Sequence, residues 1–79
     1  MSNVRVFPNP STGKTIVEFY NPQHKNYQLS VINIYGTTVL EMKDVSEGKI
    51  EIDNVNLTPG VYLVRVDGDE VFIGKMIVE

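Results

Sequence analysis

Short runs of apolar residues, broken by turn-forming residues, limit what this sequence can fold into. Turn residues recur roughly every eight to twelve positions, a spacing that is typical of an all-β sandwich or barrel. Within residues 27–33 and 49–53, apolar and polar residues alternate as they do in a half-buried strand. No segment has a sustained apolar period of about 3.6 residues, so we predict essentially no helix. The pattern therefore predicts an all-β protein.

We expect about seven strands that form a small antiparallel β-sandwich of the immunoglobulin-like type. The predicted strands span residues 4–7, 14–20, 27–33, 37–43, 49–53, 61–67 and 70–78. The strand at 61–67 is apolar on both faces, which is typical of a central strand. The predicted core consists of Val4, Val6, Val17, Phe19, Leu29, Val31, Val39, Ile50, Ile52, Leu57, Tyr62, Val64, Val66, Met76 and Val78.

The length of 79 residues allows at most one domain, which we place at residues 4–79. Residues 1–3 are expected to be a cloning start or a linker remnant, in which case the chain is part of a longer protein. A domain of this size buries only about 60–65% of its unfolded surface, so its core is thin. The sequence contains no cysteine, which excludes disulfides and cysteine-ligated metal and favours a cytosolic protein or a bacterial secreted one.

The charge and hydropathy of the chain disfavour several classes of partner. Its net charge of −3 argues against nucleic acid and anionic membrane surfaces, since both select basic proteins. No apolar run approaches the roughly 20 residues of a membrane-spanning helix, so we expect no membrane insertion. The first residues have neither the charged region nor the apolar region of a signal peptide.

The sequence offers no constellation from which an active site can be assembled. Gly13-Lys14-Thr15 matches the end of a phosphate-binding loop, but the preceding glycine of that motif is replaced by Pro8, which has no N–H for a phosphate. The residues after Lys14 favour a strand, whereas the motif requires a helix. His24 is the only histidine and lies in a polar loop. We therefore predict a protein without catalytic residues, cofactor or metal.

Three short stretches leave alternatives open. Residues 67–70, Asp-Gly-Asp-Glu, favour a hairpin turn, with a calcium site as the alternative, although calcium takes six to eight ligands and this stretch supplies about three. Lys75, between Gly74 and Met76, is either a lysine that opposes edge-to-edge aggregation or a contact for a partner. The glycosylation sequon at 56–58 is interpreted as incidental in a bacterial protein.

Four segments, in this order, resemble the Por secretion system C-terminal sorting domain, which is the type A sorting domain of type IX secretion. They are residues 7–14 (FPNPSTGK), 30–41 (SVINIYGTTVLE), 52–66 (IDNVNLTPGVYLVRV) and 74–79 (GKMIVE), and together they extend over nearly the whole chain. The chain departs from the family pattern at three places. Phe7 replaces a tyrosine, Ile32-Asn33 replaces a Tyr-Asp pair, and Gly74-Lys75 stands where a basic pair is expected.

The resemblance identifies a set of motif and candidate recognition residues, for which backbone chemistry gives a reason. Prolines end the first strand without needing N–H partners, and glycines take a positive φ that lets the next strand begin. Tyr62 is expected to place its ring in the core and its hydroxyl against the backbone. The set consists of Pro8, Asn9, Pro10, Gly13, Gly36, Leu57, Gly60, Tyr62, Lys75, Met76, Ile77 and Val78.

The resemblance implies a non-catalytic domain at the C-terminal end of a larger cargo protein of a Gram-negative bacterium. Its partners would be the type IX outer-membrane machinery and a sortase-like transpeptidase, which commonly removes the domain and leaves the cargo at the cell surface or released. A partner would bind at an exposed strand edge or along the last strand. The alternative is an appended carbohydrate- or protein-binding module, with Tyr20, Tyr27, Tyr35 and Phe72 as the available rings.

Overall fold

The computed structural model describes residues 2–10 and 12–79, with side chains described from Val4 onward. Within these residues the chain has eight β-strands and no helix, so the prediction of an all-β fold is confirmed. Seven strands match the predicted ones closely, and the two-residue β1 is additional. The strands are β1 (Ser2–Asn3), β2 (Arg5–Phe7), β3 (Lys14–Glu18), β4 (Tyr27–Ile32), β5 (Thr38–Val45), β6 (Lys49–Asp53), β7 (Gly60–Asp67) and β8 (Val71–Val78).

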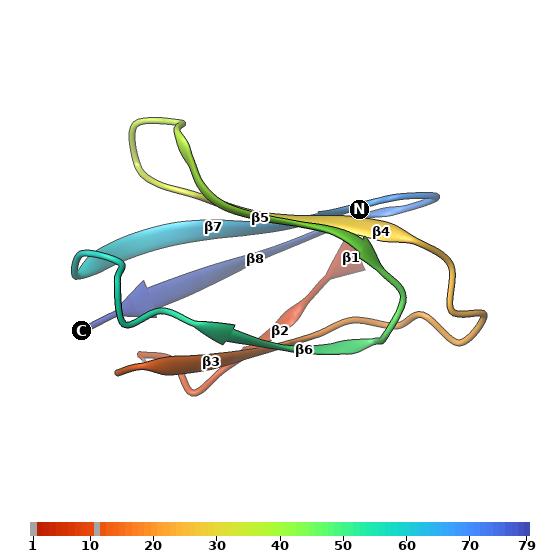
Figure 1. The fold of residues 1–79 in the computed structure, drawn as a ribbon, viewed down its shortest axis with the longest axis horizontal. Coiled ribbons are helices and arrows are strands. Elements are labelled where there is room, and N and C mark those ends of the chain that lie inside the picture. Colours follow the sequence, from red (N-terminus) through yellow and green to blue (C-terminus); the bar gives the residue numbers. More distant parts are fainter. Residues whose placement is uncertain (1, 11) are drawn as a thin grey trace.

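The strands form two sheets that pack face to face as a sandwich (Figure 1). The larger sheet has the order β1-β8-β7-β4-β5 and the smaller one the order β2-β3-β6. Neighbouring strands are antiparallel, except that β1 runs parallel to β8. β7 lies in the middle of the larger sheet between β8 and β4, as its two apolar faces predicted. β1 and β2 belong to different sheets, so the chain crosses the sandwich at Val4 (Figure 1).

The buried core between the sheets contains the predicted residues, apart from Val6, Leu57 and Val39. Val6 and Leu57 are partly buried and pack against the core. The prediction that Val39 belongs to the core was wrong, because 39% of this residue is exposed. The register between β4 and β5 shifts after Val31, which pairs with Leu40, whereas Ile32 pairs with Thr38. Leu40 and Met42 pair with the buried residues Val31 and Leu29 and pack against the core. Val39 therefore alternates to the outer face of β5 together with Glu41.

Three aromatic rings pack together at one end of the core. The centroids of Phe19 and Tyr27 are 5.1 Å apart, and the ring of Phe72 lies 5.3 Å from Phe19 and 5.7 Å from Tyr27. All three side chains are buried. The suggestion that Tyr27 and Phe72 are surface rings for a carbohydrate was therefore wrong. Both lie on the inward face of their strands, where offset and edge-to-face contacts add to apolar burial.

Gly74 lies in β8 beside Val4, the residue at which the chain crosses from one sheet to the other. A Cβ atom at this position would lie 2.3 Å from Cγ2 of Val4 and 3.1 Å from Cγ2 of Val6. The backbone at Val4 is fixed by its N–H, which donates to the carbonyl of Ile73 at 3.2 Å. A side chain at Gly74 would therefore push the crossing segment away from β8.

Substitution of Gly74→Ala is expected to destabilise the domain by about 1–3 kcal/mol, the usual cost of overpacking a core. Chemical unfolding of the purified chain measures this loss. The same substitution in a Val4→Ala background should cost less, because the contacting methyl group is gone. An equal cost in both backgrounds would show that the contact between positions 74 and 4 is not the cause.

Candidate functional site

Most of the predicted motif residues gather around the C-terminal strand β8. Lys75, Met76, Ile77 and Val78 are consecutive in this strand. The neighbouring strand β7 places Gly60 opposite Val78 and Tyr62 opposite Met76. The corner at 8–10 lies on the other side of β8, where the side chain of Asn9 contacts the backbone of Lys75 and Ile77.

Gly13 and Gly36 lie away from this group, in two turns. Gly13 precedes β3, and its carbonyl accepts a hydrogen bond from the N–H of Asn54 at 2.7 Å. Gly36 lies in the turn between β4 and β5. Their φ angles are 106° and 85°, so both have the positive φ that the sequence predicted. L side chains rarely adopt this conformation, so the backbone geometry alone accounts for glycine at both positions, and no role in binding is needed to explain them.

Asn9 bridges two backbone positions of β8. Its Nδ2 donates to the carbonyl oxygen of Lys75 at 2.9 Å, and its Oδ1 accepts from the N–H of Ile77 at 2.8 Å. Pro8 follows the end of β2, as predicted, and the peptide bonds that precede Pro8 and Pro10 are cis. β1 pairs with the same edge of β8 at positions 72 and 73. The outer edge of β8 is therefore covered by β1 in its first half and by Asn9 in its second half.

This covering disfavours strand addition along the outer edge of the last strand, which was one of the two expected modes of binding. Strand addition needs a row of free backbone N–H and C=O groups. On β8 the carbonyls of Ile73 and Lys75 and the N–H of Ile77 already have partners. β5 is the outermost strand at the opposite edge of this sheet. A partner that binds near β8 must then contact its side chains, unless it displaces Asn9.

Substitution of Asn9→Ala is expected to cost about 1–3 kcal/mol, since two hydrogen bonds of about 0.5–1.5 kcal/mol each are lost. Asn9→Asp should also destabilise the domain, because its carboxylate still accepts from Ile77 but places a second oxygen against the carbonyl oxygen of Lys75, which repels it. Urea unfolding measures both losses. Amide hydrogen exchange at Ile77 should accelerate in the alanine variant and stay slower in the aspartate variant. Unchanged exchange in both variants would show that Asn9 does not protect this edge.

Asn33 fixes the turn that joins β4 to β5. Its Oδ1 accepts hydrogen bonds from the N–H groups of Tyr35 and Thr37, both at 3.0 Å. Its carbonyl accepts from the N–H of Gly36 at 3.0 Å, and its own N–H donates to the carbonyl of Thr37 at 2.9 Å. Asn33 therefore closes a tight turn over residues 33–36, between the predicted strands at 27–33 and 37–43. Asn33 stands at the second position of the Tyr-Asp pair of the family pattern and supplies a side-chain acceptor there.

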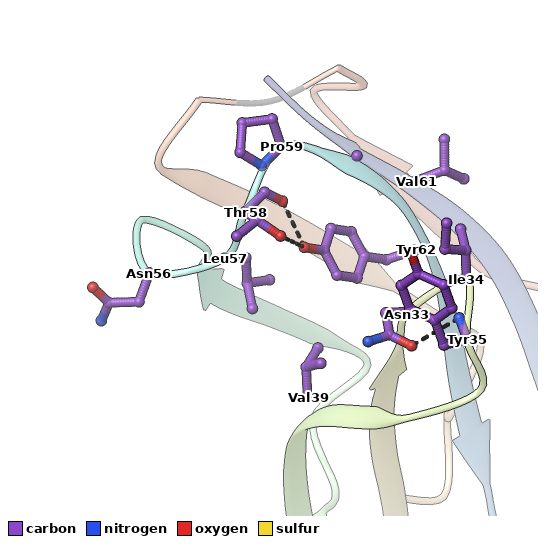
Figure 2. A pocket seen from close by; sticks show the side chains of 11 residues that line it. Asn33, Ile34, Tyr35, Val39, Asn56, Leu57, Thr58, Pro59, Val61 and Tyr62 are labelled. Carbon is purple, nitrogen blue, oxygen red and sulfur yellow. Dashed lines mark hydrogen bonds between the residues drawn. The ribbon is translucent and has the colours of Figure 1, made fainter.

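Tyr62 links β7 to the loop that precedes it. Its ring is buried, and its hydroxyl donates to the carbonyl of Thr58 at 2.5 Å and lies 3.1 Å from Oγ1 of the same residue (Figure 2). This arrangement confirms the predicted position of the ring and the predicted backbone bond. It resembles the tyrosine corner of immunoglobulin-like sandwiches, in which a hydroxyl bonds to the backbone a few residues upstream. The corner fixes the loop at 58–60 relative to the core.

An exposed apolar cluster surrounds these two turns, and we call it the end patch. Its members are the exposed residues Ile34 (73%), Tyr35 (84%), Val39 (39%), Val61 (46%) and Leu63 (40%). Two cavities of about 470 and 230 Å³ lie over the patch and share Asn33, Ile34, Val61 and Tyr62 among their lining residues. Figure 2 shows the larger one, between the Asn33–Gly36 turn and the loop before β7.

The end patch was missed by the sequence reasoning, except for Tyr35, which was considered as a free ring. The available signal was the apolar outer face of the strand at 61–67. We interpreted it as a buried face of a central strand, but within the described residues nothing packs over Val61 and Leu63. Lys75 lies opposite Leu63 on this outer face, is exposed, and lines the smaller cavity.

The stretches that suggested metal or phosphate chemistry have structural roles. Lys14 begins a strand, as predicted, and its Nζ lies 2.9 Å from Oε1 of Glu51, a hydrogen bond that raises the pKa of Lys14. Asp67 pairs with Arg65 at 3.1 Å. Asp69 pairs with Lys25 at 2.5 Å, and this hydrogen bond raises the pKa of Lys25. Over residues 2–10 and 12–79, no three side chains of His, Cys, Asp or Glu form a group that could hold a metal ion.

The comparison with protein families gives one match. A family model described as the secretion system C-terminal sorting domain matches residues 5–79. A search of curated proteins found no match. In the described part of the chain no helix is long and apolar enough to cross a membrane. The matched segment contains every motif residue from Pro8 to Val78, including the Asn9 corner, the Tyr62 corner and β8.

Proposed function

Because the chain belongs to the family of secretion system C-terminal sorting domains, we propose that it directs a larger cargo protein across the outer membrane by type IX secretion. Membership of this family supports a C-terminal secretion signal and a cargo that is secreted or held at the cell surface. In this proposal the domain follows the cargo in the parent chain and has no catalytic role. The family match over residues 5–79 is the observation on which the proposal depends.

The proposal extends to the partners and the fate of the domain. The outer-membrane secretion machinery reads the folded domain, and a sortase-like transpeptidase then removes it. The cargo is attached to the cell surface or released. The paired strands support this proposal, since an ordered sandwich presents fixed side-chain positions to a receptor.

Fusion of residues 2–79, which include β1, to the C-terminal end of a periplasmic reporter tests the proposal. In a host with type IX secretion, the reporter should appear at the cell surface or in the medium. The same fusion in an isogenic strain that lacks the secretion pore should stay in the periplasm. Equal amounts of external reporter in the two strains would contradict the proposal, and so would complete retention in both.

One observation favours a second candidate, a carbohydrate-binding module. Tyr35 is 84% exposed and lines the larger cavity together with Asn33 and Asn56, which supply amide groups. Tyr20, the other exposed tyrosine, lines a different cavity, so the two rings do not form one platform. Titration of the purified domain with soluble glycans, in wild-type and Tyr35→Ala forms, tests this candidate. Binding that is lost in the variant would support it.

A further inference from the structure

The end patch has the features of a binding surface for another protein. Among the described side chains, it gathers five of the seven large apolar residues that are exposed, and the other two, Tyr20 and Val55, line neither of its cavities. On a small soluble domain, a contiguous apolar surface of this kind marks an interaction site more often than scattered single residues do. We infer that a folded protein of the secretion pathway docks on the end patch through apolar side chains and one carboxylate, which pairs with Lys75. This inference rests on the proposed function and names the surface that is read.

The charge of the surface determines the chemistry of the partner. Of the described residues that line the two cavities, Lys75 is the only charged one. No ion pair of the described residues includes Lys75, Lys43 or Lys49, and of these three only Lys75 lines one of the two cavities. An ammonium beside Leu63 is partly desolvated when the patch is covered, so the covering protein must supply an acidic group.

The backbone segments that carry the end patch are already held in place in the free domain. Asn33 holds the turn that presents Ile34 and Tyr35 through its hydrogen bonds to two backbone N–H groups. The Tyr62 hydroxyl holds the loop on the other side of the larger cavity (Figure 2). Leu63 is paired with both neighbouring strands, and Val61 is paired with Ile77 of β8. A surface that needs little ordering on binding loses less conformational entropy in the complex.

A second copy of the chain fits this surface poorly. The residues that line the two cavities include no Asp or Glu. An isologous dimer through the patch would therefore leave both Lys75 ammonium groups without a counter-charge, and it would join two domains of net charge −3. Docking of a strand along β8 is also disfavoured, since Asn9 and β1 cover that edge. These observations favour a different protein that contacts the outer face of the sheet.

Secretion of the reporter fusion, measured with variants of the patch, tests the inference. Leu63→Asp should lower the secreted fraction about tenfold or more, since a charge is placed where a buried contact is needed. Tyr20→Asp is the matched control, because Tyr20 is 79% exposed and lies outside the patch, and it should change secretion less than twofold in the same assay. Lys75→Glu should lower secretion like Leu63→Asp, and Lys75→Arg should retain it. Thermal unfolding must show that each purified variant is folded.

The outcomes separate this inference from the proposed function. If the wild-type fusion is secreted and Leu63→Asp behaves like Tyr20→Asp, the docking surface is wrong and the function stands. If Leu63→Asp blocks secretion but Lys75→Glu does not, the acidic partner is wrong. A wild-type domain that sediments as a dimer, and that Leu63→Asp converts to a monomer, would identify a second copy as the occupant. If the wild-type fusion is not secreted, the proposed function fails and the docking surface fails with it.

Discussion

A chain that ends at Gly74 is expected to be unfolded. The deletion removes Met76 and Val78, whose side chains are 0% and 5% exposed. It also removes the pairing of β8 with residues 60–63 of β7 and both backbone partners of Asn9. Truncation of one buried methionine costs about 2–5 kcal/mol, and loss of a buried valine adds about 1.5–3 kcal/mol. A domain of 79 residues has a total stability of only about 4–12 kcal/mol.

Circular dichroism and a thermal scan of the truncated chain check this expectation. The cooperative transition of the full chain should be absent. Deletion of Glu79 alone is the matched control, because Glu79 lies beyond the end of β8 and is exposed, and it should leave the transition unchanged. A truncated chain that still unfolds cooperatively would show that the second half of β8 is not part of the stable core. If the truncated chain is unfolded, a loss of secretion after deletion of residues 75–79 cannot be assigned to recognition residues, because the fold is lost as well.

Replacement of Tyr62 by alanine is expected to have the next largest effect, with a loss of about 3–5 kcal/mol for a buried aromatic side chain. The ring is 5% exposed, and its hydroxyl bonds to the loop at Thr58. Tyr62→Phe keeps the ring and removes only the hydroxyl, so it should cost about 1–3 kcal/mol. The two substitutions separate the contribution of apolar packing from that of the corner hydrogen bond.

Urea unfolding of the two variants and the wild type measures these losses. For a domain of this size each kcal/mol also lowers the melting temperature by about 4–8 °C, so the alanine variant should lose most of its thermal margin. A phenylalanine variant as unstable as the alanine variant would mean that the hydroxyl, and not the ring, stabilises this end of the sandwich. Wild-type stability in both variants would contradict the described burial of Tyr62.

The positions of strands and turns could be predicted because local chemistry determines them. Pro8 follows the end of β2, and Gly36 has the positive φ that its turn requires. Alternation along β4 also placed Tyr27 with Leu29 and Val31 on one face, and the structure buries all three. We considered Tyr27 as a surface ring only because aromatic residues were sought for a carbohydrate site. In that case the pattern was sufficient and the functional alternative misled the interpretation.

The remaining features depend on contacts between segments distant in the sequence, which alternation does not encode. Val39 is an exception, because it alternates with Leu40 and Met42, which face the core, so the pattern itself placed it outward and our prediction did not follow the pattern. The bond of Asn9 to β8 joins positions 66 and 68 residues apart. The sequence showed that a proline-flanked corner ends a strand, but not which edge it would cover. The end patch likewise could not be predicted, because it lies on the face of β7 that the smaller sheet does not cover, and alternation does not show which face that is.

Export of the folded and the unfolded domain, compared directly, tests the central claim that the secretion machinery reads a folded sandwich. The measurement is the secreted fraction of a reporter fused to residues 2–79, in wild-type form and with Tyr62→Ala, at matched levels in the periplasm and at a temperature at which the purified variant is unfolded and the wild type is folded. We expect the wild-type fusion to be secreted and the Tyr62→Ala fusion to be retained, because the variant leaves the end patch and β8 without a fixed arrangement. Equal secretion of the two fusions would contradict the claim, since the signal would then be read from the sequence and not from the fold.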